Sequence, residues 1–122
     1  METSVQEGNE DCLFCGIIGK KIPGNIVYED DRAIAFEDVS PQAPVHLLVI
    51  PRKHISSLST LQPEDDPILA HLFSVISRLA REKGIVENGY RTVINSGRGA
   101  GQTVFHLHVH LLSGRPFQWP PG

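Results

Sequence analysis

The chain has 122 residues, of which 40% are hydrophobic and 20% charged, a composition typical of one globular domain rather than of a disordered or membrane protein. Its formal net charge of −3 argues against general nucleic-acid binding, which depends on a basic surface. Residues 1–11 are polar and acidic and lack the features of a secretory signal, and no apolar run reaches membrane-spanning length. We therefore expect a flexible N-terminal tail, one domain over residues 12–122, and a cytoplasmic location.

The first half of the domain predicts a short helix followed by three strands. Residues 12–19 suit a short amphipathic helix, which the sequence Pro23-Gly24 ends. Residues 26–29 and 33–37 flank a pair of aspartates and predict a hairpin, and residues 45–50 predict a third strand.

The second half predicts one long helix and two further strands. Apolar side chains recur at helical spacing over residues 68–80, between Pro67 and Gly84. Residues 90–95 and 104–112 are rich in residues that favour strands. Together these segments predict an α+β fold with a five-stranded antiparallel sheet, one main helix and a short N-terminal helix. The last residues, 115–122, have little regular-structure propensity and form a C-terminal tail of the same domain.

The sequence His106-Leu107-His108-Val109-His110 is the most informative motif in the chain. In an extended strand the three imidazoles share one face, while the aliphatic residues between them point to the other face. Imidazoles that titrate near neutrality can supply a nucleophile, a proton carrier and a ligand for an anion or a metal. A metal-binding ladder or an accidental histidine-rich edge remains an alternative at this point.

The chain resembles the histidine triad family from about residue 12 to residue 122. The motifs that carry the resemblance are the three alternating histidines followed by Leu111 and Leu112, and the segments 36–41, 46–51, 53–55, 95–97 and 101–103. The terminal Trp119-Pro120-Pro121-Gly122 is similar to the Hint branch of that family. This resemblance implies a homodimer that extends the sheet and hydrolyses the P–N bond of purine nucleoside 5′-phosphoramidates, the AMP- or GMP-type adducts.

Hydrolysis of a P–N bond needs a nucleophile, neutralisation of charge on the phosphoryl oxygens and a proton for the departing amine, and imidazole can meet each need. The resemblance implies that His108 is the nucleophile and forms a covalent nucleotidyl-histidine intermediate that water then cleaves. It also implies that His46 fixes the tautomer of the nucleophile or relays its proton. His110 is expected to hydrogen-bond a phosphate oxygen, and His71, which matches no motif, to lie at the surface or an interface.

The remaining binding residues are expectations from the same resemblance. Asp38 is expected to bind the ribose hydroxyls, and Trp119 to border the leaving-group pocket of a partner subunit. The phosphate contacts are expected from Asn95, Gly101, Gln102 and Thr103, and the apolar slot for the base from Ile17, Phe36 and Val39, with Phe14 and Ile22 beside them. The glycine-rich loop can equally be a plain hairpin connection, and the apolar residues can equally be ordinary core.

Cys12 and Cys15 have the spacing of one half of a tetrahedral zinc site. By similarity to bacterial members of the family and to galactose-1-phosphate uridylyltransferases, His54 and His106 would complete it. Four protein ligands leave no position for water, so Zn²⁺ would be structural and catalysis would stay with His108. The alternatives are two free thiols or a redox pair, and no helix-opening context in the sequence supports the redox pair.

Two other functions remain open at this stage. A dinucleoside polyphosphate hydrolase of the Fhit type uses a similar histidine string, and a nucleotide-binding regulatory protein with weak catalysis would share the same nucleotide contacts. The sequence identifies neither the leaving group nor a preference for adenine or guanine. We expect no organic cofactor.

Overall fold

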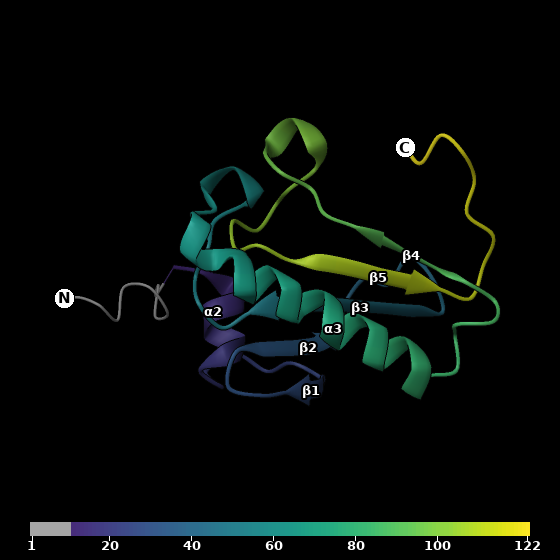
Figure 1. Cartoon of the computed structure of the whole chain (residues 1–122), viewed down its shortest axis with the longest axis horizontal. Helices are drawn as coiled ribbons and strands as arrows, with labels where there is room; N and C mark the ends of the chain where they lie inside the picture. Colours follow the sequence, from purple (N-terminus) through teal and green to yellow (C-terminus); the bar gives the residue numbers. More distant parts are fainter. Residues whose placement is uncertain (1–10) are drawn as a thin grey trace.

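The computed structural model describes residues 11–122, in which five antiparallel strands form one sheet (Figure 1). The strand order is β1-β2-β3-β5-β4, so β1 and β4 are the edges. The strands are β1 Ile26–Glu29, β2 Ala33–Glu37, β3 Val45–Pro51, β4 Tyr90–Val93 and β5 Val109–Ser113. The helices are α2 Leu13–Ile18 and α3 Asp66–Glu82, with 3-10 turns η1 Leu58–Thr60, η2 Pro63–Asp65 and η3 Arg98–Ala100. This confirms the predicted α+β fold, and all of the predicted tail except Asp11 lies outside the described residues.

Helix α3 lies across one face of the sheet and covers the main hydrophobic core (Figure 1). Side chains alternate between faces along each strand, so every second residue of β2, β3 and β5 reaches this core. The buried core residues from the strands and from the segment before β5 are Ala33, Ala35, Leu47, Val49, Leu107, Val109 and Leu111. They pack against Leu72, Val75, Ile76 and Leu79 of α3. The aliphatic half of the histidine motif therefore anchors the motif to the sheet.

The opposite face of the sheet carries a smaller core built around α2. Phe14 and Ile17 of α2 pack with Phe36 of β2, and the rings of Phe14 and Phe36 meet edge to face at 5.3 Å. The imidazoles of the histidine motif lie on this side of the sheet because their neighbours fill the α3 side.

Helix α3 has the limits that its sequence predicts. It begins at Asp66 with Pro67 in its first turn, where proline costs no hydrogen bond, and it ends just before Gly84, whose φ of +68° suits glycine. His71, expected at the surface or an interface, instead bonds Asp30 at the β1–β2 turn with a separation of 2.6 Å. Neither helix in the described part of the chain is long and apolar enough to cross a membrane.

Two predicted strands are shorter than expected. The strand predicted over residues 104–112 is β5, Val109–Ser113, because pairing with β3 runs only from Val49↔Val109 to Val45↔Ser113. Before this point the chain leaves β3, and the Leu107 N–H bonds to the carbonyl of Ile55. The strand predicted over residues 90–95 ends at Val93 because its partner in β5 begins there. His106 and His108 therefore precede the strand that carries His110.

Candidate active site and metal centre

A cavity of about 410 Å³ lies on the α2 side of the sheet and brings together most of the predicted catalytic and binding residues. Its lining combines apolar side chains with imidazole and amide groups. The predicted residues in its lining are Ile17, Phe36, Asp38, Val39, Asn95, Gly101, Thr103, His108 and His110, and Phe14 and Ile22 line it as well. These residues come from α2, β2, β5 and the loops that follow β2 and β4, so only the tertiary fold joins them.

His108 has one ring nitrogen committed to the backbone and one left for chemistry. Its Nδ1–H donates to the carbonyl of His106 at 2.7 Å, which assigns the single proton of the neutral ring to Nδ1 and leaves a lone pair on Nε2. Among the described residues, Ser96 Oγ is the one buried side-chain N or O atom without a hydrogen-bond partner. Nε2 of His108 has no hydrogen-bond partner among the described residues, and the residue lines the cavity.

His46 and His110 form a second imidazole unit beside His108. The Gln42 N–H donates to Nδ1 of His46 at 3.0 Å, so the proton of neutral His46 is on Nε2, which lies 2.9 Å from Nδ1 of His110. His110 then accepts at Nδ1 and carries its own proton on Nε2. His46 thus contacts His110, whereas the backbone carbonyl of His106 sets the tautomer of His108. This geometry differs from the implied role of His46 as the direct partner of the nucleophile.

Burial keeps this second unit neutral. Desolvation, aided by the neighbouring rings of His108 and His46, lowers the pKa of His110 to about 4, although Asp38 acts in the opposite direction. Burial also lowers the pKa of His46, even with the Asp38 carboxylate 3.4 Å from its Nε2. At neutral pH both rings are therefore neutral hydrogen-bond donors rather than cations.

Asp38 follows β2 and borders the cavity. Its Oδ1 accepts from the Ser40 N–H at 2.8 Å, and its Oδ2 faces His46. Val39, next to it, is 95% exposed and lies at the cavity mouth rather than in a closed slot.

Gln102 and Trp119, both predicted to contact substrate, lie outside the cavity lining. The Gln102 side chain is buried; it accepts from the Gly97 N–H at 2.8 Å and donates to the carbonyls of Ser56 and Val104 at 2.8 and 3.1 Å. It holds the glycine-rich loop in shape beside Gly101 and Thr103. Trp119 is 84% exposed.

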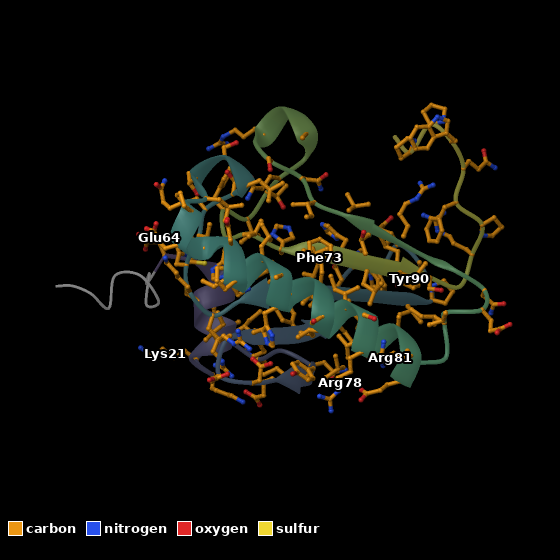
Figure 2. All side chains as sticks on the ribbon, in the orientation of Figure 1. Lys21, Glu64, Phe73, Arg78, Arg81 and Tyr90 are labelled. Atoms are coloured by element: carbon orange, nitrogen blue, oxygen red, sulfur yellow. The ribbon has the colours of Figure 1, made fainter. Side chains whose placement is uncertain are left out.

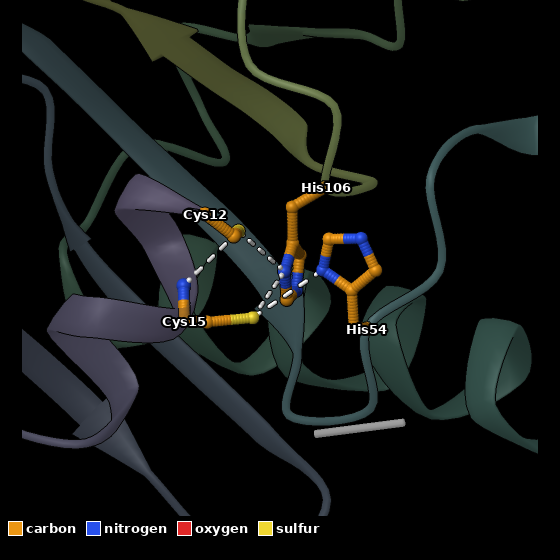
Figure 3. Close-up of side chains that lie close together, drawn as sticks. All are labelled: Cys12, Cys15, His54 and His106. Carbon is orange, nitrogen blue, oxygen red and sulfur yellow. Dashed lines mark hydrogen bonds between the residues drawn. The ribbon is translucent and has the colours of Figure 1, made fainter. Parts of the chain in front are cut away.

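Cys12, Cys15, His54 and His106 converge beside the cavity, as Figure 3 shows. Cys12 caps α2, and Cys15 lies in the first turn of that helix, which supplies the helix-opening context that the sequence did not reveal. Nδ1 of His106 lies 3.4 Å from the Cys12 sulfur and 3.5 Å from the Cys15 sulfur, and Nδ1 of His54 lies 3.3 Å from the Cys15 sulfur. For a tetrahedral Zn²⁺ with ordinary bond lengths, neighbouring S and N ligands are about 3.5 Å apart.

The donor set fits a metal better than a hydrogen-bond network. His106 donates its Nε2–H to the carbonyl of Pro51 at 2.8 Å, which leaves a lone pair on Nδ1 facing both sulfurs. A single lone pair cannot accept well from two thiols, whereas a cation can bind all of these atoms. A histidine ligand that donates its other N–H to a backbone carbonyl is also the usual arrangement around protein-bound zinc.

The residues that sequence reasoning missed act mainly through their backbone. The carbonyls of His106 and Pro51 and the N–H of Gln42 select the tautomers of His108, His106 and His46. No side-chain motif signals these roles, because any residue type offers the same backbone groups.

Comparisons with known proteins identify the family and the fold. The family model described as "HIT domain" matches residues 19–117. A HIT-like protein of Synechococcus elongatus is 53% identical over 114 residues, which cover 93% of this chain and 99% of that protein. The crystal structure of a HIT family hydrolase from Legionella pneumophila Philadelphia 1 has a TM-score of 0.89 and 47% identity, covering 91% of this chain and 99% of that one. A histidine triad nucleotide-binding protein from Candida albicans has a TM-score of 0.78 and 32% identity, over 91% and 84% of the two chains.

Proposed function

Because this chain belongs to the HIT domain family, we propose that it is a hydrolase that cleaves the P–N bond of purine nucleoside 5′-phosphoramidates. The observation that carries the proposal is His108, whose proton is held on Nδ1 by a backbone carbonyl while the Nε2 lone pair is open at the cavity. The solved relatives described as HIT family hydrolases support hydrolysis in general, and the cavity supports a nucleotide as the substrate.

In the proposed reaction, Nε2 of His108 attacks the phosphorus of a phosphoramidate whose nitrogen takes a proton from solvent. A P–N bond forms to the imidazole, and the bond to the substrate nitrogen breaks, so the amine leaves as a neutral molecule. Positive charge develops on the ring and strengthens the Nδ1–H bond to the His106 carbonyl. Water then attacks the phosphorus and returns a proton to solvent, which releases the nucleoside monophosphate and restores neutral His108. The two steps divide one difficult displacement into two easier ones.

His110 stabilises the charge on the phosphoryl oxygens in this proposal. Its Nδ1 is held by His46, so the ring can donate only from Nε2. Asn95 and Thr103 line the same cavity and carry side-chain donors for the other oxygens. A preorganised set of neutral donors needs no reorganisation as the negative charge grows.

The apolar part of the lining is suited to a nucleoside. Phe14, Ile17 and Phe36 supply apolar surface for a base, and a purine offers more stacking area than a pyrimidine. Asp38, which also lines the cavity, can accept hydrogen bonds from vicinal ribose hydroxyls.

Zn²⁺ is part of the proposal as a structural ion held by Cys12, Cys15, His54 and His106. With four protein ligands it would stabilise the fold without offering an open position to substrate. The location proposed is the cytoplasm, where thiols persist as metal ligands.

A homodimer of the Hint type completes the proposal. Strand β4 is an edge of the sheet, so a strand of a second copy can pair with its outer backbone groups and extend the sheet. Phe73 on α3, Tyr90 at the start of β4 and Trp119 in the tail are exposed (Figure 2 labels the first two). An exposed tryptophan at 84% is unfavourable for a free chain, so we propose that Trp119 packs near the cavity of the partner. Sedimentation velocity should give the mass of a dimer, and Trp119→Ala should weaken the association.

The decisive experiment compares adenosine 5′-phosphoramidate with diadenosine tetraphosphate as substrates. We expect the phosphoramidate to have the higher kcat/KM, and quenched single turnovers to yield peptides in which His108 carries a nucleotidyl group. A preference for the dinucleotide would favour the Fhit-type alternative. Tight binding of AMP without turnover of either substrate would indicate a nucleotide-binding protein instead.

A further inference from the structure

Helix α2 carries residues of both the metal centre and the cavity. Cys12 caps the helix and Cys15 lies in its first turn, and both sulfurs face the histidines of the metal centre. Phe14 and Ile17, on the same short helix, line the cavity. Any change that moves the sulfurs therefore moves this part of the cavity wall.

The helix depends on its surroundings for its position. With six residues it is too short to be stable alone, so packing and side-chain bonds must hold it. Its sulfurs contact His54, which follows β3, and His106, which precedes β5, so a metal there would tie α2 to two separate segments of the chain. Phe14 also meets the rings of His106 and His108 edge-on, at 6.1 and 5.1 Å between centroids.

We propose that Cys12 and Cys15 are positioning residues of the nucleotide cavity, because their ligation together with His54 and His106 holds Phe14 and Ile17 in its wall. The affinity for the nucleotide base then depends on whether the two thiols bind a metal, are reduced without a metal, or form a disulfide. This inference rests on the proposed function in one respect, since it requires the cavity to bind a nucleotide.

Oxidation of the two thiols to a disulfide would remove them from the metal. The two sulfurs lie within 4.8 Å of each other, and Cys12 and Cys15 are separated by one helical turn. A hydroperoxide can oxidise the two thiolates to one disulfide: the sulfurs lose two electrons, and the peroxide takes them with two protons to give an alcohol and water. The disulfide offers no thiolate to a metal, so α2 loses its attachment to His54 and His106. A groove of about 400 Å³ lined by Cys12 and His54 gives access to the site.

The test measures the dissociation constants of AMP and of ribose 5-phosphate, which lacks the base. They are compared for the reduced zinc-loaded protein, the reduced metal-free protein and the peroxide-treated protein. If α2 is seated in about one molecule in ten without the metal, the Kd of AMP rises about tenfold. The Kd of ribose 5-phosphate should stay within about twofold, because the apolar side chains of Phe14 and Ile17 offer their contact to the base, which this ligand lacks. Reduction followed by zinc should restore the affinity for AMP.

Because the chain has only two cysteines, thiol titration reports directly on this pair. Binding of Co²⁺, followed by its thiolate charge-transfer absorption, measures ligation without any reference to activity. Phe14→Ala should lose affinity for AMP while its Co²⁺ spectrum is unchanged, because this side chain acts after the metal in the proposed coupling. Lys21→Ala, an exposed position just after the helix and outside the cavity lining, is the control and should retain affinity for AMP.

The outcomes separate the two proposals. Tight binding of AMP with the same Kd in all three states would overturn the positioning role and leave the proposed function intact. An equal loss of affinity for AMP and ribose 5-phosphate would also overturn it, since general loss of structure has that effect. Failure of the reduced, zinc-loaded protein to bind AMP would contradict the proposed function itself.

Discussion

His106 and His108 are two residues apart, yet they present opposite ring nitrogens to different partners. His106 donates Nε2–H to the carbonyl of Pro51 and presents Nδ1 to two sulfurs. His108 donates Nδ1–H to the carbonyl of His106 and leaves Nε2 open at the cavity. Both rings are buried, at 0% and 6% exposure, so burial alone does not separate their roles. Backbone carbonyls therefore decide which ring nitrogen each histidine leaves for its proposed role, metal ligand for His106 and nucleophile for His108.

The largest effect is expected from His108→Ala, which removes the proposed nucleophile and leaves the metal ligands in place. The single-turnover rate on adenosine 5′-phosphoramidate should fall by about three orders of magnitude or more, as for other lost nucleophiles. His71→Ala, which removes a histidine outside the cavity lining, is the matched control and should keep nearly full activity. Retention of more than about a tenth of the rate by His108→Ala would contradict the assignment.

Removal of metal should lower the free energy of unfolding, in addition to its proposed effect on the affinity for AMP. Zinc at about 1,000 times its Kd stabilises a protein that binds it only when folded by about 4 kcal/mol, which denaturant unfolding with and without chelator can measure. His108→Ala should show the same gain, whereas His106→Ala should lose it. Identical unfolding midpoints with and without zinc in the unmodified protein would rule out a structural metal.

His110→Ala should lower kcat by about 100- to 1,000-fold, the usual cost of one lost oxyanion donor, with a smaller change in KM. His108 keeps its carbonyl partner in this variant, so the nucleotidyl adduct should still form, only more slowly. Steady-state kinetics and quenched-flow detection of the adduct measure the two effects. A variant whose kcat is unchanged would show that His110 does not contact the phosphoryl group.

A smaller effect is expected on the way the free energy of unfolding depends on pH. The folded pKa of His110, about 4, lies below the ordinary 6.5, so the folded state binds fewer protons than the unfolded state. The neutral ring therefore contributes stability above about pH 6.5, and this contribution is lost as the pH falls towards 4. At 1.36 kcal/mol for each pKa unit, the loss is at most about 3 kcal/mol. The free energy of unfolding, measured with urea at pH values from 7 to 4, should decline less steeply for His110→Gln than for the unmodified protein. Equal slopes in the two proteins would contradict this prediction.

The sequence by itself determined the architecture and the identity of the reactive groups. Alternation along the strands separates Leu107 and Val109 from the histidines, and the apolar stripe of α3 identifies the helix that covers them. These are local patterns of period 2.0 and 3.6, and they follow from backbone geometry without knowledge of the fold. The motifs also identified in advance Cys12, Cys15, His54 and His106, which the structure brings together.

Only the tertiary structure decided how those groups divide the chemistry. The strand that carries His110 begins only at Val109, although β3 continues to Pro51, because the segment that carries His106 and His108 bonds to Ile55 and Pro51 instead of pairing with β3. The partner of His46 proved to be His110 rather than the nucleophile, and Gln102 holds its loop rather than lining the cavity. The physical reason is that a tautomer depends on one nearby donor or acceptor, usually a backbone group far away in sequence. No local pattern of side chains shows which backbone group that will be.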